Sequence, residues 1–204
     1  MPHTLSQNKG FTLVELLVVI AIVAVLSTVV IITLNPAELL RQTRDSTRIS
    51  DMATMKSAIA LYLADVLEPD IGGVLAGTTC YVSAPPSTPA MAAGCGGAFP
   101  SLTVTMQTQP TDATTARKVD SNGWIPVNFT TISAGTPLGS LPIDPVNNAT
   151  YFYAYAANAS FQYEIDAVME STRYNSGTGN VMDKDGGDVD EFYEVGTNLE
   201  ITGV

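Results

Sequence analysis

The sequence predicts an α+β fold in which one long N-terminal helix packs on a small antiparallel β-sheet. Residues 11–34 form a nearly uninterrupted apolar run, and apolar residues then recur every three or four positions as far as residue 67, which is helical spacing. Apolar and polar residues later alternate over 161–170, after a tyrosine-rich run at 151–156, and alternation is the period of a β-strand. These observations suggest four parts, namely a leader (1–10), an apolar helix (11–34), its amphipathic continuation (35–68) and a globular head (69–204).

The apolar run is long enough to cross a bilayer. As a helix, residues 11–34 would rise about 36 Å, compared with a hydrocarbon core of roughly 30 Å. Lys9 precedes the run and predicts a cytoplasmic N-terminus, with the chain after Leu34 on the outer side. An ordinary secretory signal fits poorly, because its apolar region is shorter and ends in a small-residue cleavage site.

The segment Lys9-Gly10-Phe11-Thr12-Leu13-Val14-Glu15 resembles the processing site of type IV prepilins and pseudopilins. The resemblance implies a pilin fold, cleavage by prepilin peptidase between Gly10 and Phe11, and N-methylation of Phe11. It also implies assembly with copies of itself and other pilin-like subunits on an inner-membrane platform. The chain would then be a single-pass protein of the cytoplasmic membrane before assembly and part of an extracytoplasmic or cell-surface filament afterwards.

Glu15 is the only charged residue in the run, and an unpaired carboxylate in an apolar span is costly. One interpretation places it near the membrane interface, where its side chain reaches water. The resemblance implies another, in which Glu15 is an assembly residue that pairs with the Phe11 amine of a neighbouring subunit. Its own Phe11 amine, one helical turn away, would serve as its partner while the subunit waits in the bilayer.

The continuation begins at Asn35-Pro36, which has two interpretations. Asn35 could cap a new helix that starts at Pro36, or Pro36 could kink one continuous helix. We expect the kinked continuous helix, ending near Glu68-Pro69.

Charged residues crowd the first turns of this continuation. They are either a solvated face with local ion pairs or a contact between subunits. They are Arg41, Arg44, Asp45, Arg48 and Asp51.

The head is expected to begin with a long connecting region, because Gly, Pro, Ser and Thr dominate residues 69–123. Cys80 and Cys95 suit one disulfide if the head is exported. An antiparallel hairpin follows over 151–170, and we expect its second strand to be half-buried, with its polar face toward solvent. Residues 124–129 could add an edge strand. Residues 141–145, leading into the hairpin, are similar to a segment of the major pseudopilins of type II secretion but lack a Trp-Gly pair.

An acidic loop lies near the C-terminus, over residues 183–191. Its carboxylates suit Ca²⁺, and major pseudopilins similarly bind calcium near the C-terminus. The candidate ligands are Asp183, Asp185, Asp188 and Asp190. A solvated acidic loop without a metal is the alternative.

Composition limits the possible functions. The net charge of −11 opposes binding to nucleic acid. His3 is the only histidine and lies in the expected leader, so the mature chain would lack imidazole chemistry. Together with this composition, the resemblance of residues 9–15 to prepilins implies a filament subunit of a type IV pilus or pseudopilus, and we expect no enzyme. A singly anchored calcium-binding or enzymatic ectodomain that does not polymerise is the alternative.

Overall fold

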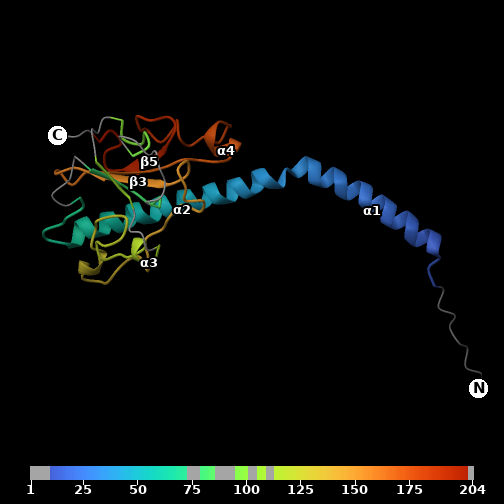
Figure 1. The fold of residues 1–204 in the computed structure, drawn as a ribbon, viewed down its shortest axis with the longest axis horizontal. Helices are drawn as coiled ribbons and strands as arrows, with labels where there is room; N and C mark the ends of the chain where they lie inside the picture. The colour runs from blue at the N-terminus through green and yellow to red at the C-terminus, as the bar shows by residue number, and fades with distance from the viewer. Residues whose placement is uncertain (1–9, 73–78, 86–94, 101–104, 109–112, 202–204) are drawn as a thin grey trace, which may run out of the picture. The chain divides into compact units, whose positions relative to one another are not determined.

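The structure is a computed structural model that describes residues 10–72, 79–85, 95–100, 105–108 and 113–201 (Figure 1). The chain divides into two compact units, residues 1–40 and 41–204. The N-terminal unit contains helix α1 and the first turn of α2, and the second unit contains the rest of α2 and the sheet. The helices are α1 (Leu13–Leu34), α2 (Pro36–Asp65), α3 (Ala113–Ala116) and α4 (Thr172–Asn175).

Helix α1 follows directly from the apolar run, and it ends at Asn35, which has a left-handed backbone (φ 42°). The carbonyl of Asn35 accepts hydrogen bonds from the backbone amides of Glu38 and Leu39, at 3.0 and 3.3 Å. Helix α2 therefore starts afresh at Pro36. The helical region spans residues 13–65 and is interrupted at one residue, Asn35. We expected a continuous helix with a kink at Pro36, and the structure instead has two helices separated by this left-handed residue.

The sheet has five strands in the order β2-β1-β3-β4-β5. Strands β1, β3, β4 and β5 are antiparallel to their neighbours in this set, and β2 is parallel to β1. The strands are β1 (Thr79–Val82), β2 (Thr105–Thr108), β3 (Tyr153–Ala157), β4 (Tyr163–Ala167) and β5 (Tyr193–Gly196). The predicted α+β class and the hairpin, formed by β3 and β4, are confirmed.

Two expectations about the head are wrong. The region 69–123 contributes strands β1 and β2 and helix α3. Strand β1 pairs with the edge of β3 that faces away from β4, and β2 pairs with β1. Residues 124–129 form no strand, and their ladder contact is an isolated bridge between Asp120 and Asn128. Pro126 has no amide hydrogen to donate, which works against a ladder there.

The main core lies between α2 and one face of the sheet. Met52, Met55 and Ile59 of α2 pack with tyrosines of β3 and β4 and with Trp124. The indole N–H of Trp124, the one polar group of that side chain, donates a hydrogen bond to the Pro142 carbonyl at 2.8 Å. The predicted packing of the helix on the sheet is confirmed, and Figure 1 shows α2 running alongside β3 and β5.

A second core covers the opposite face of the sheet. It includes the disulfide cysteines, Phe99, Phe152 and Phe192. Ala154 and Ala156 of β3 face this core, so their partners in β4, Asp166 and Glu164, face it too. Every residue of β4 is buried, and the expectation that its polar face meets solvent is therefore wrong.

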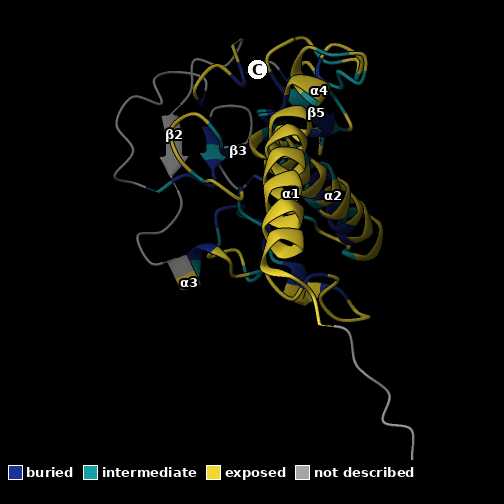
Figure 2. Cartoon of the chain, turned by 90° about the vertical axis from the view of Figure 1, so that its right-hand side faces the viewer, coloured by how far each residue is buried: buried dark blue, intermediate teal, exposed yellow. Residues whose placement is uncertain are grey.

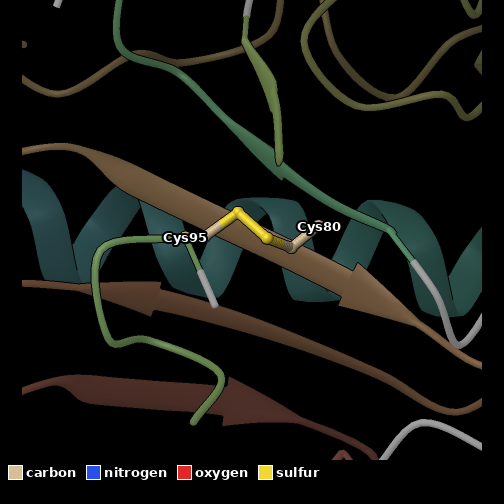
Figure 3. Close-up of a disulfide and its surroundings, with 2 residues drawn as sticks. All are labelled: Cys80 and Cys95. Carbon is tan, nitrogen blue, oxygen red and sulfur yellow. A yellow bond between two sulfur atoms is a disulfide. The ribbon is translucent and has the colours of Figure 1, made fainter. Parts of the chain in front are cut away.

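Cys80 and Cys95 form the expected disulfide. Figure 3 shows the bond on the near side of the sheet, with α2 on the far side. Both cysteines are fully buried. The bond fixes β1 to a segment fifteen residues later in the chain.

We expect loss of this disulfide to destabilise the head by about 3 kcal/mol, because closing a loop of this size restricts the unfolded chain. Urea unfolding of residues 37–204 with and without a reducing agent measures the difference. A Cys80→Ala/Cys95→Ala variant should unfold at the lower midpoint in both conditions. Equal midpoints for the oxidised and reduced wild type would contradict the expectation.

Candidate processing and assembly site

Gly10 and Phe11 lie ahead of α1, outside any helix, and both are exposed, with Phe11 at 90%. A Cβ atom added at Gly10 would meet no atom within 4 Å, and Gly10 is not among the residues with a positive φ. The fold therefore does not require glycine at position 10. The peptide bond after Gly10 is open to an external enzyme.

Glu15 caps the start of α1. Its carboxylate accepts hydrogen bonds from the backbone amide and the hydroxyl of Thr12, both at 2.8 Å. In return, the Thr12 hydroxyl oxygen accepts from the Glu15 amide at 3.2 Å, which completes a capping box. The negative charge thus lies at the positive end of the helix dipole, one turn from Phe11.

The surface of α1 is apolar on all sides. Every residue from 10 to 37 is exposed, and Figure 2 shows α1 in the exposed colour along its whole length. The hydroxyl groups of Thr28 and Thr33 donate to backbone carbonyls of the helix itself, those of Ala24 and Val29. A helix that is apolar all round needs lipid or other protein around it.

The length of α1 fits a bilayer. Its 22 residues rise about 33 Å. Among the described residues, α1 is the one helix that is long and apolar enough to cross a membrane. A signal sequence near an N-terminus would meet the same two criteria, so the residues that precede the helix decide between the two.

Comparison with known families supplies that decision. Residues 5–31 match the family model described as the prokaryotic N-terminal methylation motif. This chain carries the methylation motif of the type IV pilin and pseudopilin class. The matched residues include Gly10, Phe11 and Glu15. No curated protein and no solved structure matches the chain.

The methylation motif implies processing by prepilin peptidase in a pilin-like or pseudopilin-like protein. Together with the apolar helix, it suggests membrane anchoring or export. Proteins with this motif are typically not enzymes. The structure places the three residues of the predicted site within the first turn of α1 and just ahead of it, on one exposed segment.

Two charged residues of α2, Asp45 and Arg48, form a local ion pair that is buried rather than solvated. Arg48 is fully buried, and its guanidinium binds both oxygens of Asp144, at 2.6 and 3.0 Å. It also donates to Asp45 at 2.7 Å, and lies over the ring of Tyr151. The predicted solvated or intersubunit face is thus partly an intramolecular connection between helix and head.

Further hydrogen bonds join α2 to the segment that follows β4. Asp45 accepts from the backbone amides of Glu170 and Ser171, at 2.9 and 2.7 Å. Burial opposes the charge of Arg48, but its bonds to Asp144 and Asp45 outweigh burial and raise its pKa above the usual value. Nearer the surface, the hydrogen bond from Arg44 lowers the pKa of Glu170.

A signal for this burial was present in the sequence. The buried residues of α2 include Asp45, Arg48, Met52, Met55 and Ile59, at successive steps of three and four. Asp45 and Arg48 therefore continue the apolar stripe by one more turn toward the N-terminus. Charged residues in line with the buried stripe of a helix indicate that they are buried as an ion pair. The helical pattern does not show which distant residue completes the pair, here Asp144.

The acidic loop contributes one of its four predicted ligands to a cluster. Among the described residues, Glu164, Asp188 and Glu194 form the group whose ligand atoms lie close enough to hold a metal ion, all within 4.8 Å of one another. Asp183 and Asp190 are exposed, and Asp185 binds backbone amides. Sequence reasoning missed Glu164 because it gave β4 a polar face away from the core, and it missed Glu194 because it predicted no strand at β5.

Proposed function

We propose that this chain is a structural subunit of a type IV pilus-like or pseudopilus filament. Prepilin peptidase would cut it between Gly10 and Phe11 and methylate the new Phe11 amine, and the mature chain would polymerise through its N-terminal helix. The observation that carries the proposal is the position of the methylation motif at the start of a helix that is apolar on every side.

The geometry at Gly10 supports external processing. Since the fold has no need of glycine there, the small residue serves an enzyme that must bring the peptide bond close to its own backbone. The bond lies just before the capping box, so cleavage leaves α1 intact. Residues 1–10 would be the removed leader, 11–34 the membrane and assembly helix, 35–68 its continuation and 69–204 the head.

Two successive environments would cover α1. Before assembly the lipid bilayer surrounds it, with the N-terminus inside and the single-pass chain in the cytoplasmic membrane. An inner-membrane assembly platform then transfers it into the filament, where copies of this chain and other pilin-like subunits replace lipid. The filament lies outside the cytoplasm or at the cell surface.

Glu15 connects processing to assembly in this proposal. In the uncleaved chain its carboxylate binds Thr12, a partner that the chain itself provides. Cleavage creates a cationic amine at Phe11. In a filament, where water is excluded around the helices, that amine and the Glu15 carboxylate of a neighbour would neutralise each other.

A membrane-anchored, calcium-binding ectodomain is the second candidate, and the acidic cluster of the head favours it. The cluster is compatible with a filament subunit too, because it lies in the unit of residues 41–204. Glu15 separates the candidates: in a simple anchor its carboxylate would only cap α1 through Thr12, whereas in a filament subunit it would also neutralise the amine of a neighbour.

Processing can be tested by intact mass. The native protein should begin at Phe11 and carry one added methyl group. A Gly10→Val variant should keep residues 1–10, because the larger side chain blocks the peptidase while the fold has room for it. Gly139→Val is the matched control, since a Cβ there also meets nothing within 4 Å, and it should be processed normally. Assembled wild-type protein that retains the leader would contradict the proposal.

A further inference from the structure

Three carboxylates share the face of the sheet that points away from α2. Glu164 and Asp166 are two residues apart on β4, and Glu194 of β5 lies directly opposite Asp166. All three residues are at most 1% exposed. Their neighbours on β3 are Ala156 and Ala154, whose small side chains leave the carboxylates space on this face.

Most oxygens of these carboxylates have no hydrogen-bond partner among the described residues. In the part of the chain that the structure describes, five of their six oxygens are buried without a hydrogen bond: Glu164 Oε1 and both oxygens of Asp166 and of Glu194. The remaining oxygen, Glu164 Oε2, accepts from the Ile201 amide at 3.2 Å. Buried polar atoms are rarely left unsatisfied in folded proteins, and three adjacent unpaired acids indicate a missing positive charge.

The electrostatics of the cluster agree with this conclusion. Burial, followed by repulsion from neighbouring acids, raises the pKa of Asp166 and of Glu194 well above the ordinary values. Burial likewise raises the pKa of Glu164. Among the described residues, these shifts reflect burial and mutual repulsion of the acids.

The acidic loop brings a fourth carboxylate to the same place. Asp188 joins Glu164 and Glu194, with one ligand oxygen from each within 4.8 Å of the others. Asp185 fastens the loop to β5, because its carboxylate accepts from the amides of Glu194 and Gly187, at 2.8 and 3.0 Å.

Gly187 lets the loop approach the cluster closely. A Cβ atom at this position would lie 1.0 Å from the Glu194 carboxylate. Glycine here therefore permits a contact between loop backbone and carboxylate that any other residue would prevent. The close fit places the backbone of the loop directly against the Glu194 carboxylate.

We propose that Glu164, Asp188 and Glu194 bind one Ca²⁺ ion, which holds the acidic loop against the sheet. The ligands are all hard oxygens, without His or Cys, and Ca²⁺ tolerates the irregular geometry and the six to eight oxygens that carboxylates and backbone supply. Asp166 lies buried beside them, directly opposite Glu194. The four ligands predicted from the sequence all lay in the acidic loop. Of those four, the ligands proposed here retain Asp188 alone. The proposal does not depend on polymerisation.

Calcium titration of the full-length chain tests the site. The protein is purified in a non-ionic detergent, stripped with EDTA and titrated with CaCl₂ by calorimetry, with thermal unfolding followed by the fluorescence of Trp124. We expect one saturable site, and at a hundredfold excess over Kd a rise in Tm of about 5–10 °C. MgCl₂ should produce a smaller rise, because Mg²⁺ requires stricter octahedral geometry. Identical melting curves in calcium and in EDTA would overturn the proposal.

Two variants assign the ligands. Glu164→Gln keeps the shape of the side chain, so the protein should fold as well in EDTA as the wild type, but bind Ca²⁺ at least tenfold more weakly. Asp190→Asn, the control on the exposed side of the same loop, should bind like the wild type. Full calcium affinity in Glu164→Gln, or loss of affinity in Asp190→Asn, would assign the ion to the loop alone and overturn the set proposed here.

Discussion

Cells that produce Glu15→Leu should make no filaments, while the processed subunit accumulates in their membrane. The substitution removes the one carboxylate of α1 and leaves the helix without a charged residue, so membrane insertion is preserved. Gly10 and Phe11 are unchanged, so cleavage should continue. In the filament, however, the Phe11 amine would enter an apolar core without a partner, at a cost of several kcal/mol per subunit. Repeated at every subunit, this penalty should stop elongation.

Two further variants separate the charge of Glu15 from its size and polarity. Glu15→Gln keeps the shape and can still accept from the Thr12 amide, but it cannot neutralise a cation, and it should also fail to assemble. Thr28→Val removes another polar group of α1, one whose hydroxyl is satisfied by Ala24 within the helix, and should assemble normally. Filament yield is measured by immunoblotting sheared and membrane fractions. Normal yield from Glu15→Leu would refute the pairing role.

The second large effect concerns the buried ion pair of the head. Arg48→Met should lower the free energy of unfolding by about 3–5 kcal/mol, because it leaves two buried carboxylates, Asp45 and Asp144, without their cation. Asp144 lies 96 residues from Arg48 in the chain. The loss should therefore free α2 from the segment that leads into β3. Urea unfolding of residues 37–204 gives the value.

Arg41→Met is the matched control for this measurement. It makes the same substitution on the same helix, at a residue whose side chain is 49% exposed and lies 3.8 Å from Glu170. Exposed ion pairs contribute little, so the change should stay below about 1 kcal/mol. Equal effects of the two substitutions would show that Arg48 behaves as a surface charge and contradict the account of the buried pair.

Local patterns in the sequence predicted the elements whose signals lie within a short stretch of chain. The apolar run became α1, the stripe through Met52, Met55 and Ile59 became the buried side of α2, and the alternation after residue 151 became the β3–β4 hairpin. The processing motif is equally local, and the family match covers it.

The parts that were missed depend on partners far away in the chain. Strand β1 has four residues in a Gly- and Thr-rich region, and it is a strand because it pairs with β3. Glu164 and Asp166 alternate with apolar residues as solvent-facing acids do, and nothing local shows that the loop near Asp188 covers them. The burial of Arg48 likewise requires Asp144, which no helical periodicity can supply.

The most direct test of the filament proposal is to shear cells that produce the wild-type chain and examine the released material. Electron microscopy should show thin fibres, and mass spectrometry of their subunit should find this chain beginning at a methylated Phe11. The same fraction from Glu15→Leu cells should contain neither. A wild-type chain that is processed but stays wholly in the membrane fraction, and that cannot be cross-linked to copies of itself there, would contradict the account and favour the anchored ectodomain.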